Sequence, residues 1–412
     1  MSLNNTPSSE RVQIAFFGKT NAGKSSLINA ITDQEISLVS DVKGTTTDPV
    51  KKAMELLPLG PVTIIDTPGL DDDTQLGELR RKRTMEIMKQ IHVAVIVVDA
   101  VIGKTEVEEH LEEQLKQKQI SYLYVYNKVD LLSPGKDVKK QTTNGVGEDI
   151  SADGEAQDSR IVYVSAHTKE NLELLKEKIA SLKVEKIEKK LVADLLQEGD
   201  HVLLVIPIDK AAPKGRLILP QQQTIRDILD ANCTLSICQV ESVASTLQML
   251  DQPPKLVITD SQVFGKVKDL VPQNIKLTSF SILFARYKGD LEGNVKGAEV
   301  IEELQDGDKV LISEGCTHHR QCGDIGSEKL PNWILKYTGK NIKFVFTSGG
   351  DFPEDLSPYR LIIHCGACML NEKQMQERTC RAKEQNIPMT NYGIIIAYLN
   401  GILKRSIELL GM

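Results

Sequence analysis

The chain has 412 residues and a formal net charge of −7, from 57 acidic and 50 basic side chains. This length is enough for about three domains of ordinary size, and the acidic balance argues against a protein whose main activity is non-specific nucleic-acid binding. No apolar run is long enough to cross a bilayer, and no signal-peptide core is evident, so we predict no membrane contact and a cytoplasmic location. The seven cysteines lack the spacing of a disulfide framework, which indicates metal ligands or free thiols.

In chain order, the first predicted element is an apolar strand at 12–17, which leads into Gly18-Lys-Thr-Asn-Ala-Gly-Lys-Ser25, a match to G-x-x-x-x-G-K-S, and then into a helix at 26–31. This order is typical of a loop whose backbone N–H groups wrap a phosphate chain. We expect Lys24 to reach the β- and γ-phosphates and the Ser25 hydroxyl to bind Mg²⁺. The predicted phosphate-binding residues are Gly18, Asn21, Ala22, Gly23, Lys24, Ser25 and Ser26.

Three further motifs stand at the ends of later apolar runs: Asp66-Thr-Pro-Gly69, Asn127-Lys-Val-Asp130 and Ser165-Ala166. The first is expected to place a carboxylate near Mg²⁺ and a glycine N–H near the γ-phosphate. The Asp130 carboxylate can accept two N–H bonds from guanine, which adenine cannot offer. The predicted base-binding residues are Asn127, Lys128, Asp130, Ser165 and Ala166. Together the four motifs predict a GTPase domain that binds GTP and GDP.

A threonine run after Gly44, Thr45 to Thr47, is predicted as the first switch, with Thr46 completing the Mg²⁺ shell. The predicted catalytic residues are Lys24, Asn21, Thr46, Asp66 and Gly69. Leu70 stands where Ras-like switches place a water-orienting glutamine. With Asn21, this feature resembles the tRNA-modification class of GTPases. That resemblance implies a K⁺ ion, held by Asn21 against the phosphates, in the role that an arginine finger has elsewhere.

The predicted fold class is α/β with three domains, at 1–185, 186–285 and 286–412. The first alternates strands at 12–17, 62–66, 93–99, 121–126 and 161–165 with helices at 75–91 and 105–118, and has a polar insertion at 134–158. That pattern predicts a P-loop GTPase fold with ligands at the carboxyl ends of the strands.

Two smaller parallel-sheet α/β domains are predicted beyond a charged bridge at 183–190. The second domain has predicted strands at 201–208, 235–240, 255–259 and 276–277 and helices at 222–231 and 242–250. The third has predicted strands at 309–312, 343–346 and 361–363 and helices at 296–304, 370–385 and 390–410. The last helix is apolar nearly all round, so we expect it in the core or in a subunit contact.

A cysteine and histidine constellation marks the third domain: Cys316-Thr-His318-His319, and then His364-Cys365-Gly-Ala-Cys368 directly after a predicted strand. If the strands that precede Cys316 and Cys365 are neighbours in a parallel sheet, the three thiolates meet at one point. Three cysteines with a histidine suit either a closed zinc site or an iron–sulfur cluster with a labile fourth position. Cys322 is an alternative ligand, whereas Cys233, Cys238 and Cys380 have no partner at ligand spacing.

The three-part organisation and the C-T-H-H … H-C-x-x-C pattern resemble the HydF family, the GTPase maturation factors of FeFe-hydrogenase, over essentially the whole chain. The segments 212–220 and 224–230 look like that family's middle-domain signature. The resemblance implies a homodimer formed by the middle domain and a 4Fe–4S cluster held by Cys316, Cys365 and Cys368. For the fourth position, the candidates are His318, His364 and Asp324, and Cys322 is worth testing.

The family resemblance also implies function. Such a protein is a scaffold or carrier for a transient di-iron subcluster, and its partners are the FeFe-hydrogenase apoenzyme and radical-SAM maturation enzymes, with no nucleic acid. The alternative from another class is a cation-dependent GTPase of RNA modification or ribosome assembly, in which the three cysteines hold structural zinc. The acidic charge and the lack of a clustered basic, aromatic surface count against that alternative.

Overall fold

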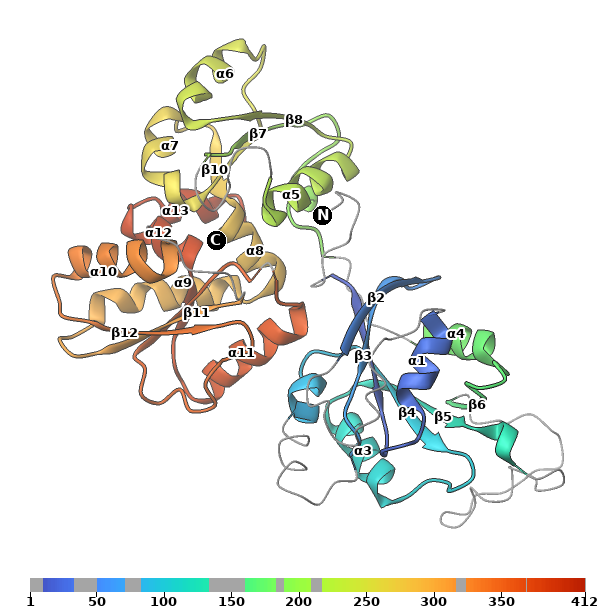
Figure 1. Ribbon diagram of the computed structural model, residues 1–412. Coiled ribbons are helices and arrows are strands. Elements are labelled where there is room, and N and C mark those ends of the chain that lie inside the picture. Colours follow the sequence, from blue (N-terminus) through green and yellow to red (C-terminus); the bar gives the residue numbers. More distant parts are fainter. Residues whose placement is uncertain are drawn as a thin grey trace. The chain divides into compact units, whose positions relative to one another are not determined.

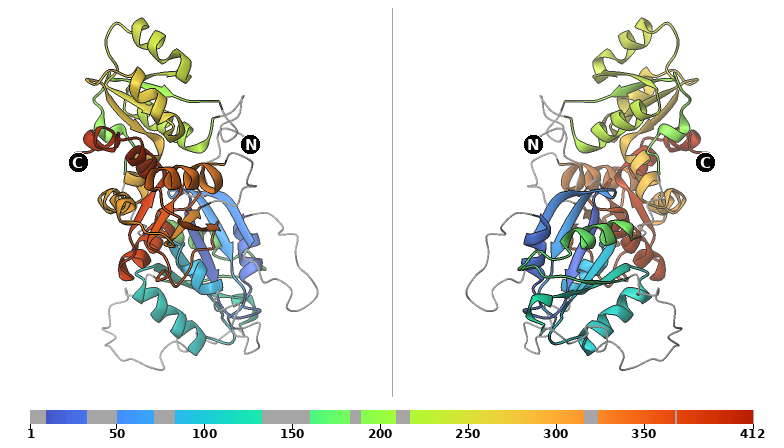
Figure 2. Two further views of the ribbon diagram at one scale, coloured as in Figure 1. Left: turned by 90° about the vertical axis from the view of Figure 1, so that its left-hand side faces the viewer. Right: turned by 90° about the vertical axis from the view of Figure 1, so that its right-hand side faces the viewer.

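The computed structural model describes residues 10–32, 50–70, 83–132, 160–182, 189–208, 217–315, 324–367 and 369–411. The chain divides into two compact units, Met1–Lys186 and Ile187–Met412 (Figures 1 and 2). Across the described residues, none of the helices combines the length and the apolar character that a membrane crossing needs. The predicted insertion at 134–158 and most of the charged bridge at 183–190 lie outside these residues.

The first unit contains a six-stranded sheet in the order β2-β3-β1-β4-β5-β6. Its strands are β1 (Val12–Phe17), β2 (Val50–Leu56), β3 (Gly60–Asp66), β4 (Val93–Asp99), β5 (Ser121–Asn127) and β6 (Ile161–Tyr163). All neighbours are parallel except β2 and β3. The central strands are buried along nearly their whole length, as expected of a parallel sheet covered on both faces.

Helices cover both faces of this sheet (Figure 1). The helices are α1 (Lys24–Thr32), α3 (Glu106–Gln117), α4 (Leu172–Ser181) and a short one at 83–88. One apolar layer contains α1 and α4, and the opposite layer contains α3 and the helix at 83–88. The predicted P-loop GTPase architecture is confirmed, although the sequence analysis gave no strand at β2 and no bounds for α4, and the helix predicted at 75–91 is described only at 83–88.

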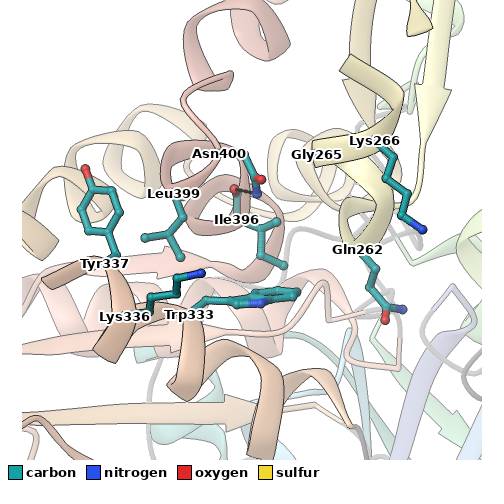
Figure 3. Close-up of a pocket in the computed structure, with 9 residues that line it drawn as sticks. All are labelled: Gln262, Gly265, Lys266, Trp333, Lys336, Tyr337, Ile396, Leu399 and Asn400. Carbon is teal, nitrogen blue, oxygen red and sulfur yellow. Dashed lines mark hydrogen bonds between the residues drawn. The ribbon is translucent and has the colours of Figure 1, made fainter. Parts of the chain in front are cut away.

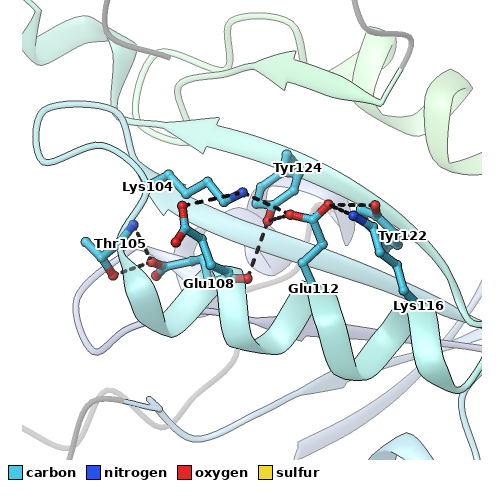
Figure 4. Close-up of polar contacts among 8 residues, drawn as sticks. Lys104, Thr105, Glu108, Glu112, Lys116, Tyr122 and Tyr124 are labelled. Atoms are coloured by element: carbon cyan, nitrogen blue, oxygen red, sulfur yellow. Dashed lines mark hydrogen bonds and ion pairs between the residues drawn. The ribbon is translucent and has the colours of Figure 1, made fainter. Parts of the chain in front are cut away.

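The Glu112 side chain on α3 forms hydrogen bonds with two tyrosines of β5 (Figure 4). Its carboxylate accepts hydrogen bonds from the hydroxyls of Tyr122 and Tyr124 at 2.8 and 2.7 Å, and it pairs with Lys104 and Lys116 at 2.9 and 2.8 Å. Burial by itself would raise the pKa of Glu112, but the hydrogen bonds from these four side chains outweigh it and hold that pKa well below its usual range. The network joins α3 to β5, the strand that carries the Asn127 motif.

The second unit contains two four-stranded parallel sheets, in the orders β10-β9-β7-β8 and β12-β11-β13-β14. The strands of the first are β7 (His201–Val205), β8 (Thr234–Cys238), β9 (Leu256–Thr259) and β10 (Lys276–Ser279). Those of the second are β11 (Lys309–Glu314), β12 (Lys343–Ser348), β13 (Leu361–His364) and β14 (Met389–Asn391). The two parallel-sheet domains predicted from the sequence are therefore present as sheets.

The helices of the second unit are α5 (Leu219–Asp230), α6 (Val243–Met249), α7 (Phe264–Leu270), α8 (Phe280–Lys288), α9 (Leu291–Glu299), α10 (Leu330–Thr338), α11 (Glu372–Glu384), α12 (Tyr392–Leu399) and α13 (Leu403–Glu408). One hydrophobic core contains residues of both sheets together with α12, which is buried from Tyr392 to Ala397. The core position expected for the last helix is confirmed.

The prediction of one continuous helix at 390–410 was wrong. Residues 389–391 pair with β13 as a strand, because a parallel sheet continues there before the helix starts. The helix then ends at Leu399, and α13 begins at Leu403. Between them Gly401 has a φ of 67°, a left-handed conformation that glycine adopts without strain and that interrupts a helix.

Candidate nucleotide and cysteine sites

The P-loop lies between β1 and α1, and two of its glycines are required by close packing. A Cβ on Gly18 would lie 2.2 Å from the carbonyl oxygen of Val97, and one on Gly23 would lie 2.3 Å from Nδ2 of Asn127. Gly18 and Gly23 have φ values of 147° and 87°, and Asn21 between them has a φ of 64°. This alternation of backbone conformations curls the loop, as a phosphate cradle requires.

Lys24, Ser25 and Asp66 form the predicted phosphate and Mg²⁺ region. The Lys24 ammonium donates to the carbonyls of Gly18 and Lys19 at 3.0 and 2.8 Å, so it lies in the mouth of the loop. The Ser25 hydroxyl donates to Asp66 Oδ2 at 2.5 Å. Burial raises the pKa of Asp66, and the neighbouring Ser25 and Lys24 oppose that rise.

The other oxygen of this carboxylate shows that the region fits a cation. Asp66 Oδ1 is buried and has no hydrogen-bond partner within the described part of the chain. A buried carboxylate oxygen next to a serine hydroxyl is the oxygen set that Mg²⁺ prefers in P-loop proteins. When bound there, Mg²⁺ would neutralise phosphate charge. Thr46, the third predicted Mg²⁺ ligand, lies outside the described residues.

Gly69 brings the Asp66 motif against the P-loop. A Cβ at this position would lie 2.2 Å from Oγ1 and 2.8 Å from the backbone N of Thr20. The Thr67 hydroxyl anchors the same turn by donating to the carbonyl of Phe16 at 2.6 Å. The two motifs are thus packed together at the carboxyl ends of β1 and β3.

The base-binding motifs converge on Asn127, which is buried. Its Nδ2 donates to the carbonyl of Ala22 at 3.1 Å, and its Oδ1 accepts from the backbone N–H of Ala166 at 3.0 Å. Asp130 Oδ1 accepts from the Ser165 hydroxyl at 2.6 Å. The structure therefore joins the P-loop, Asn127-Lys-Val-Asp130 and Ser165-Ala166 into one site.

Asp99 is a residue of this site that the sequence analysis missed. It ends β4 in register with Asn127, and its Oδ2 pairs with the Lys128 ammonium at 2.6 Å. Lys128 has a φ of 69°, so its backbone is held in a left-handed conformation next to this ion pair. An acidic residue at the end of the buried strand before the motif is the signal that could have revealed it.

The cysteine region lies at the carboxyl ends of β11 and β13, which are parallel neighbours, as the thiolate hypothesis required. The Cys365 Sγ accepts hydrogen bonds from the backbone N–H groups of Gly315 and Ala367, at 3.0 and 3.4 Å. A Cβ on Gly315 would lie 2.9 Å from Cγ of Leu370. The residue directly before Cys316 thus lies against the loop that contains Cys365.

Several predicted ligands are not described: Cys316, His318, Cys322 and Cys368. A search limited to the described residues finds no group of three metal-binding side chains. His364 is described and fully buried. Its Nε2 is 2.7 Å from Arg378 Nη1 and its Nδ1 is 2.9 Å from the carbonyl oxygen of Cys365. Burial and the Arg378 charge lower the pKa of His364 to about 3.

These contacts occupy both ring nitrogens of the neutral His364, so this side chain offers no nitrogen to a cluster in the present arrangement. Asp324, another candidate, accepts from the backbone N–H and the hydroxyl of Ser327, both at 2.9 Å, and so caps a helical turn. Glu314 was missed by the sequence analysis. It is buried two residues before Cys316 and accepts from the Tyr392 hydroxyl at 3.3 Å.

A hollow of about 590 Å³ lies elsewhere in the second unit, where α7 faces α10 and α12 (Figure 3). It is lined by the indole of Trp333, the apolar side chains of Ile396 and Leu399, and the exposed lysines Lys266 and Lys336. The described residues that line this hollow include no cysteine.

Three family models match the chain. Residues 13–128 match the 50S ribosome-binding GTPase model, residues 191–289 the hydrogen maturase F dimerization domain, and residues 292–409 the hydrogen maturase F tetramerization domain. The two hydrogen maturase F models together cover more than half of the 412 residues. The chain belongs to the hydrogen maturase F family. The predicted family is thereby confirmed, and the first unit of the chain contains a P-loop GTPase domain. The sequence analysis did not anticipate a tetramerization domain.

Two curated GTPases match part of this chain. The tRNA modification GTPase MnmE of Aquifex aeolicus is 29% identical in an alignment of 214 residues that covers 47% of this chain and 47% of MnmE. GTPase Der of Maridesulfovibrio salexigens is 35% identical over 127 residues, 30% of this chain and 28% of Der. The chain therefore spans about half or less of the length of these relatives. Among solved structures, that of Aquifex aeolicus Era is 19% identical to this chain, with a TM-score of 0.33. The matched region covers 63% of this chain and 97% of the Era chain.

Proposed function

We propose that this protein is a GTP-hydrolysing scaffold that holds a 4Fe–4S cluster through Cys316, Cys365 and Cys368. In this role it assembles or delivers the di-iron subcluster during FeFe-hydrogenase maturation. Its partners would be the hydrogenase apoenzyme and radical-SAM maturation enzymes. The observation that carries the cluster assignment is the contact between Gly315 N–H and Cys365 Sγ, at 3.0 Å.

Two features of the cysteine region support the cluster. The strand pairing of β11 with β13 brings Gly315, the residue before Cys316, next to Cys365, which supports a site with ligands from both segments. The Cys365 sulfur also accepts two backbone N–H bonds, and hydrogen bonds to sulfur are a means by which proteins stabilise and tune iron–sulfur centres. When bound, such a cluster supplies an iron that can hold an exchangeable ligand. His318 remains the histidine candidate for that position.

The domain roles follow the same proposal. Residues 1–185 would bind and hydrolyse GTP, residues 186–285 would form the dimer contact, and residues 286–412 would hold the cluster. The match of residues 292–409 to a tetramerization domain adds a second association surface, so we expect assemblies larger than the predicted homodimer. Light scattering over a range of protein concentrations measures the stoichiometry directly.

Metal analysis after anaerobic purification tests the proposed function. We expect about four iron and four sulfide per chain and a broad absorption band near ~400 nm. Stoichiometric zinc without colour would refute the cluster, and would favour the alternative of an RNA-modification or ribosome-assembly GTPase with a structural zinc site. The relatives MnmE and Der are the reason to keep that alternative as an outcome of the test.

Loading and delivery are tested in a second step. The protein carrying its cluster is incubated with the maturation enzymes, re-isolated, and mixed with hydrogenase apoenzyme, and hydrogen evolution is measured. Activation should require the re-isolated protein and should fail when Cys365→Ser replaces the wild type. Equal activation by that variant would contradict the scaffold role while leaving the GTPase in place.

A further inference from the structure

Lys288 is a buried lysine outside the sites described so far. It is the last residue of α8 and has only 4% of its surface exposed. It belongs to the segment that matches the dimerization domain, residues 191–289, which extends four residues beyond the boundary predicted at 285. Removing an ammonium group from water is unfavourable unless the protein supplies acceptors in good geometry, so the position of this charge calls for a partner.

The partners of Lys288 lie in the segment that matches the tetramerization domain. They belong to the loop that contains Cys365, Ala367 and Leu370, which we call the cysteine loop. Its ammonium donates to the carbonyls of Ala367 and Leu370 at 2.8 and 2.7 Å, and it lies 5.7 Å from the ring centre of Phe284. Ala367 has a φ of 54°, a left-handed conformation that is strained for alanine. One buried side chain therefore holds the carbonyl of a strained residue that is two positions from Cys365.

Arg378 lies beside the same region. It is also 4% exposed, and its guanidinium contacts His364 Nε2 at 2.7 Å and the hydroxyl of Ser313 at 3.3 Å. The segment around Cys365 is thus accompanied by two buried cations, which come from helices α8 and α11. Thiolate ligands bring negative charge, and nearby cations stabilise the thiolate form of cysteine.

We propose that Lys288 is a positioning residue by which the dimerization domain controls the cysteine loop: it holds the loop through Ala367 and Leu370 and offsets the charge of the thiolates. The second half of this proposal rests on the proposed cluster function. The first half concerns the protein without metal. Iron retention would then depend on a residue outside the segment 292–409, which matches the tetramerization domain and contains the three cysteines.

Lys288→Met tests the proposal, because methionine keeps much of the side-chain length and removes the charge and the donors. Lys288→Arg is the conservative variant, and Lys296→Met is the control, since Lys296 is 71% exposed and lies on the next helix. Amide hydrogen exchange at Ala367 and Leu370 is measured in the full chain without metal. We expect exchange about tenfold faster in the methionine variant than in the control, with the arginine variant closer to the wild type.

Iron loss to a chelator is then measured after anaerobic reconstitution with iron and sulfide. Loss should be about tenfold faster in Lys288→Met, the lower end of what outer contacts of metal ligands contribute. Circular dichroism and GTP hydrolysis serve as folding controls. If the methionine variant does not fold, Lys288→Gln, which keeps a donor but no charge, takes its place in both measurements.

The outcomes separate the two proposals. Wild-type protein without bound iron and sulfide would refute the proposed cluster, whereas the exchange measurement would still test how Lys288 holds the loop. Exchange and iron loss within twofold of the control in the uncharged variant that folds would overturn the role of Lys288. Faster exchange with unchanged iron loss would overturn the charge-balancing half alone.

Discussion

The nucleotide site and the cysteine site are built in different ways. At the nucleotide site, residues from one sheet edge bind one another directly: Asn127 joins Ala22 to Ala166, and Ser25 joins α1 to Asp66. At the cysteine site, the strands are equally buried, but the loop after Cys365 is held by Lys288, which comes from a helix of the preceding domain. The described part of the first site therefore lies within one unit, whereas the second depends on a residue of the segment that matches the dimerization domain.

The largest effect is expected from Lys24→Ala. The Lys24 ammonium lies at the mouth of the P-loop, and no other described lysine donates to the carbonyls of Gly18 and Lys19. GTP hydrolysis should fall by about 100-fold or more, because a preorganised charge on the phosphates is lost. The rate is measured by phosphate release, with Lys19→Ala as control. Iron content should not change, and a parallel loss of iron would mean that the two sites are not independent.

Cys365→Ser tests the same independence of the two sites by changing the cysteine site. We expect this variant to lose most of its iron and to keep wild-type GTP affinity, because Cys365 lies in the second unit. Cys380→Ser is the matched control, since Cys380 is exposed on α11. This control variant should keep the iron content of the wild type. Nucleotide affinity and bound iron are measured on the same preparation. Retention of the full iron content in the Cys365 variant would remove this cysteine from the ligand set.

Asp130→Asn should change which base is bound. The amide offers a donor where the N–H groups of guanine need an acceptor, so GTP affinity should fall about 10- to 100-fold. Xanthosine triphosphate, whose base has a carbonyl in place of the guanine amino group, should bind the variant better than it binds the wild type. Competition titrations measure both nucleotides. An unchanged preference for GTP would show that Asp130 does not read the base.

The proposed K⁺ ion has a smaller expected effect. Hydrolysis should rise several-fold when Na⁺ is replaced with K⁺, as an ion that supplies charge to the phosphates would cause. Asn21→Gly should remove most of that rise. Glycine is the suitable substitution because Asn21 has a φ of 64°, which glycine adopts without strain and alanine does not. Equal wild-type rates in both salts would contradict the ion and leave GTP hydrolysis itself unaffected.

The smallest effect is expected from Glu112→Gln, which removes the charge at the centre of the α3 network. Loss of hydrogen bonds to a charged group should destabilise the first unit by about 2 kcal/mol, and lower its Tm by about 4 to 8 °C. The exposed neighbour Glu113→Gln is the control. The single tryptophan, Trp333, reports on the second unit. The unfolding transition followed by circular dichroism should therefore move to a lower temperature, while the transition followed by Trp333 fluorescence should not move.

The effect of Glu112 on stability has a defined pH dependence. Its pKa is lowered in the folded protein, so its stabilisation is complete above the pKa of an unfolded glutamate, about 4.3, and is lost as the pH falls below that value toward the folded one. The Tm difference between wild type and Glu112→Gln should stay constant from about pH 8 to pH 6 and narrow below about pH 4. A difference that grows in acid would contradict this assignment.

Sequence patterns predicted well those features that depend on short, regular signals. Buried parallel strands such as β4 are continuous apolar runs, and the P-loop and Asn127 motifs have fixed spacing, so their order specified the GTPase architecture. Strand β2 was missed because Lys51, Lys52 and Glu55 interrupt any continuous apolar run, on a strand at the edge of the sheet next to β3. Strand β14, of three residues, merged with the apolar helix that follows it.

Contacts between distant segments account for what the sequence did not reveal at the sites. Asp99 meets Lys128 only because β4 and β5 are in register, and Lys288 meets Leu370 across 82 residues. Nothing in the local sequence separates such a lysine from a solvent-exposed one. The contact between the His364 ring and Arg378 likewise could not be predicted from the sequence, because Arg378 lies fourteen residues further along the chain.

The core that α12 shares with both C-terminal sheets limits how this protein can exchange parts in evolution. Recombination near residue 187 separates two units that each have a core of their own. A crossover between residues 289 and 292 would instead divide one core, and would separate the apolar residues Leu203 and Val257 from Ile394 and from the core residues on β11 and β13. Lineages can therefore replace the GTPase as a module, whereas the two C-terminal domains must be inherited together.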